Sequence, residues 1–149
     1  MPVTTHRAPV RDIDPTTLYR ILWLRVQVFV VEQEAAYPEL DGRDIEAGAE
    51  LLWAEEDGEV LSTARVLVED DTTRIGRVAT SSAGRGRGIA ADLMRQAVGR
   101  CLELRPGAPI DLDAQAHLAD WYARFGFVAH GDLFHEDGIP HVAMRHPGA

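Results

Sequence analysis

Lysine is absent from this sequence, and all 15 of its basic residues are arginine. A chain without lysine cannot contain the P-loop motif GxxxxGK[ST], form a lysine Schiff base or use lysine as a general base. Cysteine is nearly absent as well, since Cys101 is the only one and cannot form an internal disulfide. That usage predicts the reducing cytoplasm as the location of the protein.

Long hydrophobic runs are also missing, because no apolar stretch approaches the roughly 20 residues that a membrane-spanning helix needs. The first residues, MPVTTHRAPVRD, do not have the pattern of a signal peptide. We therefore expect no membrane partner. The 149 residues are 46% hydrophobic and 26% charged, the balance of a globular protein. This length and balance predict a single domain over residues 1–149.

Basic residues are outnumbered by acidic ones, 15 against 24, which gives a net charge of −9. This excess argues against general nucleic-acid binding, which needs a surplus of cations. The charge is uneven, however. Residues 74–100 hold six arginines and one acid, a local charge of +5, so the rest of the chain carries −14. Such a segment indicates either an anionic ligand or a solvated helix face.

Hydrophobic periodicity divides the chain into helices and strands. Asp14-Pro15 is typical of the N-cap and first residue of a helix, although the β-branched run at 26–31 leaves its end open. A second apolar stripe begins at Ile89, and a third helix is expected at 117–125. The expected strands are residues 49–56, 59–69, 73–80, 109–115, 127–131 and 141–145, with a short edge strand near 3–7. This order predicts a mixed α/β sheet around one core.

The most informative segment is the glycine-rich turn Arg85-Gly86-Arg87-Gly88-Ile89-Ala90, which lies between an expected strand and an expected helix. The N-terminus of a helix carries unpaired N–H groups and about half a positive charge. Glycines let a phosphate approach the backbone closely, and the two arginines add charge-assisted donors. The turn therefore predicts a bound diphosphate.

Two families satisfy this physical requirement. Gly86-x-Gly88-x-x-Ala91 matches the dinucleotide fingerprint GxGxxG/A, so a nicotinamide-dependent oxidoreductase is one alternative. A Rossmann unit places that turn after its first strand, whereas here several strands precede it. Arg85-x-x-Gly88-x-Ala90 resembles instead the [R/Q]-x-x-G-x-[G/A] motif of the GNAT superfamily of acetyl-CoA-dependent N-acetyltransferases. Tyr122-x-x-x-Gly126-Phe127 resembles the downstream Y-x-x-x-G-F of the same family.

The ElaA-like branch of that family resembles the chain over several further segments, which are RVQVFVVEQ at 25–33, Asp41-Gly42, AQAH at 114–117 and EDGIPH at 136–141. The resemblance implies a mixed, mostly antiparallel sheet flanked by helices. It also implies transfer of an acetyl group from acetyl-CoA to a primary amine of a small molecule or peptide, directly in a ternary complex. A non-catalytic acetyl-CoA-binding module is the alternative from another functional class.

The resemblance also implies which residues would contact acetyl-CoA. A bulged strand would pair with the pantetheine arm, and the turn would hold the diphosphate. The implied contacts are Val78, Ala79, Thr80, Arg85, Gly86, Arg87, Gly88, Ile89, Ala90 and Gln115. The chain departs from the broad pattern at Ser82, where many members have proline, and at Gln115, where many have asparagine.

Tyr122 matches the usual general acid of the family. Amine attack on a thioester expels a thiolate, whose conjugate acid has a pKa of about 8.5, against about 10 for tyrosine. Proton donation is then slightly uphill and should occur as the sulfur leaves. The alternative is that Tyr122 is an ordinary packing aromatic beside Trp121 and Phe125.

The amine acceptor would be met by residues of the acidic segment 32–46 and of the C-terminal hairpin. Glu32 and Glu34 are candidates for the base, and His141 is a candidate for contact with the acceptor. The segment would attract a cationic amine or would simply be a solvated acidic loop. The six histidines show no metal-ligand spacing, so we predict no metal site. Cys101 lies on an apolar stripe and is expected to be an inert core residue. Whether the chain pairs with a second copy as a homodimer stays open.

Overall fold

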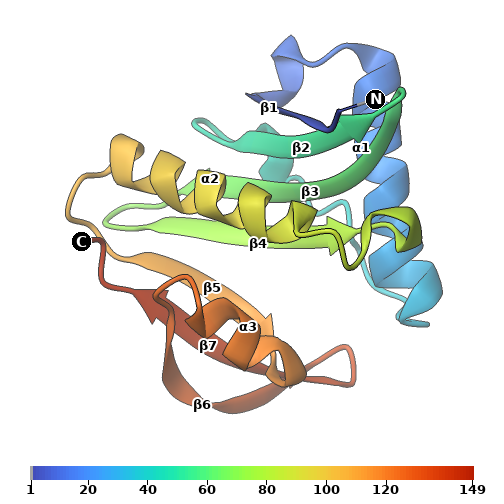
Figure 1. Cartoon of the computed structure of the whole chain (residues 1–149). Helices are drawn as coiled ribbons and strands as arrows, with labels where there is room; N and C mark the ends of the chain where they lie inside the picture. Colours follow the sequence, from blue (N-terminus) through green and yellow to red (C-terminus); the bar gives the residue numbers. More distant parts are fainter. Residues whose placement is uncertain (1) are drawn as a thin grey trace.

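The computed structural model describes residues 2–149, so residue 1 of the predicted domain lies outside the described part. A seven-stranded sheet has the strand order β1-β2-β3-β4-β5-β7-β6 (Figure 1). The strands are β1 (Thr4–Ala8), β2 (Glu50–Glu56), β3 (Glu59–Val68), β4 (Thr73–Thr80), β5 (Ile110–Gln115), β6 (Val128–Glu136) and β7 (Ile139–His146). β4 and β5 are parallel, and every other neighbouring pair is antiparallel. The predicted mixed and mostly antiparallel sheet is confirmed.

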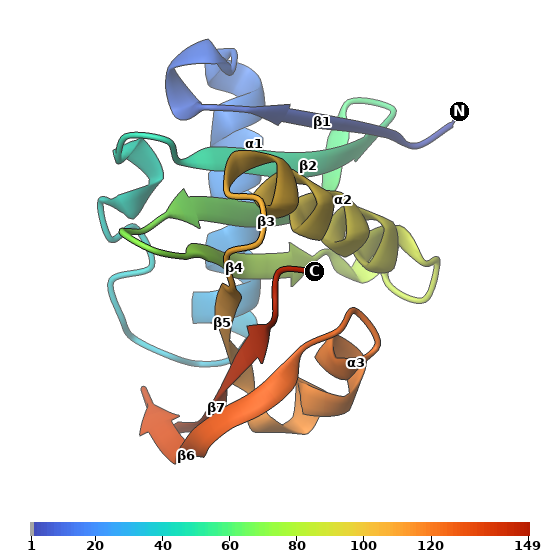
Figure 2. The same ribbon diagram turned by 90° about the vertical axis from the view of Figure 1, so that its left-hand side faces the viewer.

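Helices cover both faces of the sheet (Figures 1 and 2). The helices are α1 (Pro15–Val26), α2 (Ile89–Leu104) and α3 (Ala119–Ala123). Alternation along β2 explains how one strand serves two cores. Leu51 and Trp53 pack with the apolar residues of α1, whereas Leu52 packs with those of α2. Tyr122 and Phe127 belong to the α2 core, so α3 contributes to the same layer.

The end of the first helix, which the sequence left open, is now defined: α1 continues through the β-branched run as a wider π-helical turn, Gln27–Glu32. Two sets of predicted boundaries are wrong, each for a local reason. The helix predicted at 117–125 is a 3-10 turn, Ala116–Leu118, followed by the short α3. The last two strands run up to Asp137-Gly138, both with positive φ, because this pair closes a tight hairpin. None of the helices in residues 2–149 is long and apolar enough to cross a bilayer.

Gly126 ends the segment that carries Tyr122 and shows why glycine stands there. Its φ is +96°, and a Cβ at this position would lie 2.7 Å from the ring of His146. Both the backbone conformation and the contact with β7 therefore exclude a side chain. The Gly126 turn fixes how the chain passes from α3 into β6.

Replacing Gly126 by alanine is expected to destabilise the protein by about 2 kcal/mol or more, because positive φ strain and overpacking act together. Urea unfolding measures the change. The matched control is Gly99→Ala, inside α2, where an added Cβ meets nothing within 4 Å and φ is not positive. Alanine should stabilise that helix by roughly 0.5–1 kcal/mol. Equal effects at the two glycines would contradict this account of Gly126.

Candidate functional site: a cleft where two parallel strands part

β4 and β5 form a ladder only at their first residues, where Thr73 pairs with Ile110 and Arg74 with Asp111. Beyond Arg74 the two strands diverge, and β4 has no strand on that side (Figure 2). A cleft of about 1090 Å³ occupies this region. It is lined by β4, by the glycine-rich turn, by the Ala116–Leu118 turn with α3, and by the start of β7. The cleft thus exposes backbone of a central strand, which sheets normally keep paired.

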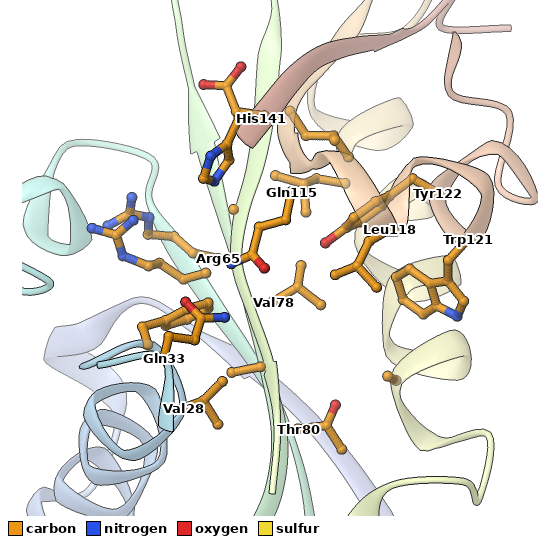
Figure 3. Close-up of a pocket in the computed structure, with 18 of the residues that line it drawn as sticks. Val28, Gln33, Arg65, Val78, Thr80, Gln115, Leu118, Trp121, Tyr122 and His141 are labelled. Atoms are coloured by element: carbon orange, nitrogen blue, oxygen red, sulfur yellow. The ribbon is translucent and has the colours of Figure 1, made fainter. Parts of the chain in front are cut away.

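A β-bulge in β4 lies at the divergence, as the family resemblance implies. Thr63 of β3 pairs with Ala79 and Arg65 with Gly76, so two residues of β4 oppose the single Ala64. Arg77 in the bulge has φ +51°. Bulges of this kind bend a strand and redirect its side chains. Val78 and Thr80 both face the cleft in Figure 3.

The glycine-rich turn forms one end of the cleft. Gly86 and Gly88 have φ values of +74° and +76°, and Gly88 is the N-cap of α2. No side chain caps this helix, and a Cβ at either glycine would meet nothing within 4 Å. The first N–H groups of the 16-residue α2 therefore border open space. This is the arrangement that binds anions at helix N-termini.

The arginines of the turn are ion-paired with carboxylates from other elements. An Nη of Arg85 lies 2.6 Å from Glu32, and its Nε donates to the Thr80 carbonyl. Arg87 lies 2.6 Å from Glu56, and its hydrogen bonds lower the pKa of that carboxyl. Both guanidinium groups are about half exposed. Exposed pairs of this kind contribute little to stability, so an incoming phosphate could replace the carboxylates.

In the folded protein, ion pairs neutralise the basic charge of residues 74–100. The other four arginines of residues 74–100 also form ion pairs. Arg74 pairs with Glu69 and Asp113, Arg77 with Glu39 and Asp41, Arg95 with Asp92, and Arg100 with Glu50. The acidic remainder of the chain supplies most of the partners. The segment is therefore not a free basic surface, and its α2 part includes a solvated helix face with the exposed pair of Arg95 and Asp92. The geometry of the turn, rather than the summed charge, supports an anion site.

The acidic segment 32–46 is not a solvated loop, because three of its acids form a buried ionic network with arginines. Arg25, fully buried on α1, donates to both Glu39 oxygens at 2.9–3.1 Å and to Asp44 at 2.6 and 3.1 Å. Arg65 of β3 donates to both oxygens of Asp41 at 2.8 and 3.1 Å. Burial opposes charge on Arg25, but the hydrogen bonds to Asp44 and Glu39 outweigh it and raise its pKa.

This network connects the acidic segment to the bulge of β4. Arg77 donates to the Glu39 carbonyl at 2.9 Å and to Asp41 at 3.2 Å, and its guanidinium lies 5.6 Å from the ring centre of Tyr37. Burial acts to raise the pKa of Asp41, but the hydrogen bond from Arg65 and its neighbours lowers it to about 2. Asp41 is therefore charged at neutral pH, and the wall that it forms is rigidly paired.

Tyr122 has its ring in the core and its hydroxyl at the cleft. The ring packs edge-on against Trp121 with centroids 4.9 Å apart, and the residue is 8% exposed. Figure 3 shows the phenol oxygen directed toward the space between Gln115 and Val78. Burial raises the pKa of Tyr122 to about 12. The hydroxyl is therefore protonated throughout the physiological range and can act only as a proton donor there.

His141 lies opposite Gln115, its cross-strand partner on β5. Its Nδ1 is 2.8 Å from the Ile139 carbonyl, and its ring stacks on Phe134 with centroids 5.7 Å apart. His141, Gln115 and Tyr122 all point into the cleft (Figure 3). His141 lies on β7, Gln115 is the last residue of β5, and Tyr122 lies on α3.

Most of the site residues predicted from the sequence line the cleft. They are Val78, Ala79, Thr80, Arg85, Gly86, Gly88, Ile89, Ala90, Gln115, Tyr122 and His141. Arg87, Glu32 and Glu34 do not line it. Glu32 is occupied by Arg85, and Glu34 is exposed at a φ of +51°. Arg65 and Tyr37 line the cleft but were missed by sequence reasoning. Among residues 2–149, no three His, Cys, Asp or Glu side chains form a group suited to a metal ion.

A bulged strand that diverges from its parallel neighbour, beside a glycine-rich helix N-terminus, is the arrangement that the GNAT resemblance implies for an acyl-CoA-dependent N-acyltransferase. Comparison with known proteins agrees: residues 24–146 match the acetyltransferase (GNAT) domain model, and the chain belongs to that family. UPF0039 protein Rv2851c of Mycobacterium tuberculosis is 44% identical over 149 residues, covering 97% of this chain and 93% of that protein. Protein ElaA of Escherichia coli is 38% identical, covering 89% of each chain. The predicted ElaA-like resemblance is thereby confirmed.

A solved structure supports the same assignment. The crystal structure of an acyl-CoA N-acyltransferase from Pseudomonas aeruginosa superposes with a TM-score of 0.92 and 39% sequence identity. The superposition covers 97% of this chain and 99% of the other. The similarity therefore includes both the split between β4 and β5 and the C-terminal hairpin.

Proposed function

We propose that the protein is an N-acetyltransferase that moves the acetyl group of acetyl-CoA to a primary amine of a small molecule or peptide. One observation carries the proposal: the Tyr122 hydroxyl faces the cleft where β4 leaves β5, with the α2 N-terminus at one end. We propose direct transfer in a ternary complex, because acetyl donor and amine would then meet in one cleft. Our predicted location is still the cytoplasm, and a homodimer is still open.

We propose the acetyl-CoA contacts from the backbone groups that border the cleft. The edge of β4 at Val78, Ala79 and Thr80 would pair with the pantetheine arm as an added strand does. The N–H groups of residues 85–90 would hold the diphosphate, where the open space above Gly86 and Gly88 lets it approach. Gln115, across the cleft from β4, would contact the same arm.

The proposed reaction needs two donor groups from the protein, a hydrogen-bond donor for the oxyanion and a proton donor for the leaving thiolate. The N–H near Ala79, next to the bulge, would stabilise the oxyanion that forms when the amine attacks the thioester carbon. Tyr122 would donate its proton to the departing sulfur. Its pKa of about 12 exceeds that of the thiol, so the transfer should accompany cleavage of the C–S bond rather than precede it. Position, more than acid strength, then determines its contribution.

The acceptor end of the cleft favours a cationic amine. Arg65 and Arg77 are each paired with carboxylates of the buried network, whereas Glu136 is more than half exposed at the hairpin turn. The unpaired charge at this end is therefore negative. Of the acceptor contacts expected from sequence, we retain His141, because Glu32 and Glu34 do not line the cleft.

An amine-panel assay tests the proposed function. Each candidate amine is incubated with acetyl-CoA, and free thiol and product mass are followed together. We expect thiol release matched by an amine that gains one acetyl group. Tight coenzyme A binding without release for any amine would indicate the non-catalytic binding module, and binding of NAD(H) in its place would indicate an oxidoreductase.

Arg85→Ala is expected to weaken coenzyme A binding by about tenfold or more, since a charge-assisted hydrogen bond to phosphate contributes about 1.5–3 kcal/mol. Isothermal titration calorimetry measures the affinity. Arg95→Ala, on the exposed side of α2 and outside the cleft, is the matched control and should leave the affinity unchanged. A similar loss in both variants would mean that only general charge matters, not the turn.

A further inference from the structure

The reaction needs a group that removes a proton from the acceptor, because an alkyl ammonium with a pKa of about 10.4 cannot attack while protonated. We infer that Nε2 of His141 takes that proton and that Glu136 passes it on to solvent. The inference rests on the proposed N-acetyltransferase function. It assigns a catalytic residue on the acceptor side of the cleft, opposite the proton donor Tyr122.

The hydrogen bonding of His141 leaves one nitrogen for this role. Nδ1 lies 2.8 Å from the carbonyl oxygen of Ile139, which can only accept, so Nδ1 must carry the hydrogen. The neutral ring then presents the lone pair of Nε2. Stacking on Phe134 and pairing of β7 with β5 hold the ring in place. The side chain is only 11% exposed and lines the cleft, so an amine bound in the cleft could reach its free nitrogen.

An acidic side chain lies beside Nε2 of His141. The cleft is also lined by other titratable and charged groups, which are Glu136 and Asp137 from the hairpin, Tyr37, Asp41 and Arg43 from segment 32–46, Arg65 from β3, Glu69, Arg74 and Arg77 from β4 and its approach, Arg85 from the glycine-rich turn, Asp113 from β5, and Tyr122 and Arg124 from α3 and its end. Arg65 and Arg77 are paired with Asp41 and Glu39, Arg43 and Arg74 with Glu69, Arg85 with Glu32, and Asp113 with Arg74. Glu136 lies 3.9 Å from Nε2 and is 58% exposed. Because 3.9 Å exceeds hydrogen-bond distance, a bridging water would pass the proton from Nε2 to this carboxylate, which faces solvent.

His141 and Tyr122 together account for every proton that moves in the reaction. The ammonium brings three N–H protons, and the amide product keeps one. The first goes to Nε2 of His141 before attack and leaves through Glu136. The C–N bond then forms as the C–S bond breaks, Tyr122 gives its proton to the sulfur, and the second nitrogen proton is lost as the amide forms. That proton restores the phenol, so the net release is one proton, through His141.

The experiment compares two acceptor amines with His141→Gln in the full-length protein. With an alkylamine acceptor, kcat/KM should fall by about 100-fold or more at neutral pH, as for loss of a general base. With a fluorinated alkylamine, whose nitrogen is already unprotonated at neutral pH, the loss should shrink to a few-fold. Coenzyme A affinity should be unchanged.

His135→Gln is the matched control, because His135 follows Phe134 on β6, is exposed and does not line the cleft. It should keep the full rate with both amines. Glu136→Gln, at an exposed position that does not threaten folding, should lower the alkylamine rate several-fold. Equal losses of His141→Gln with both amines would overturn the inference. Absence of acetylation of any amine by the unchanged protein would instead overturn the proposed function.

Discussion

Replacement of Tyr122 by phenylalanine is expected to lower kcat by about 100-fold or more, the usual contribution of a positioned general acid. The phenol has no hydrogen-bond partner within residues 2–149, and phenylalanine keeps the packing against Trp121. The melting temperature and the coenzyme A affinity should therefore be unchanged. Steady-state thiol release, calorimetric binding and thermal unfolding measure the three quantities on the same protein.

Tyr19→Phe is the matched control for this prediction, because Tyr19 on α1 is 70% exposed and lies away from the cleft. It should have the kcat of the unchanged protein. If Tyr122→Phe kept the full kcat, Tyr122 would be an ordinary packing aromatic, the alternative that the sequence left open. A loss of kcat together with a large loss of stability would likewise fail to support the acid role.

Replacement of Arg25 by methionine is expected to destabilise the fold by about 3–5 kcal/mol, because Glu39 and Asp44 would keep buried charges with fewer partners. Methionine keeps much of the volume of the side chain, so a cavity is not the main cause. For a chain of this size the melting temperature should fall by roughly 10 °C. Thermal unfolding followed by circular dichroism measures the shift.

Arg95→Met is the control, since Arg95 forms an exposed ion pair with Asp92 on α2. Pairs of that kind contribute about 0–1 kcal/mol, so the melting temperature should hardly change. If Arg25→Met melted like Arg95→Met, the network would not hold segment 33–46 in place, and the rigid acceptor wall would have no support.

Much of the fold was predictable because local patterns and tertiary structure agree. β4 was predicted at its observed bounds, Thr73–Thr80, and α2 begins at Ile89 as its apolar stripe indicates. The Asp14 N-cap forms as expected, with its side chain accepting from the N–H of Thr17. Hairpin lengths were underestimated, because β6 is exposed along most of its length and so lacks the alternation that marks a strand.

The cleft was only partly predictable. The glycine-rich turn and Tyr122 lie in short motifs, so the sequence places them directly. The buried network could not be read in the same way, because its pairs lie 14 to 38 residues apart in the chain. One signal was present: Arg25 occupies a helical position between Leu22 and Val28 on an apolar stripe. A cation at such a position must find buried carboxylates, and the acidic segment supplies them.

The central claim is that backbone amides of the turn hold coenzyme A so that its sulfur reaches Tyr122. A crystal structure of the complex with coenzyme A measures this most directly. We predict the diphosphate on the N–H groups of residues 85–90 and the sulfur within about 3.5 Å of the Tyr122 oxygen. A diphosphate bound elsewhere, or a sulfur on the far side of the cleft from that oxygen, would contradict the account.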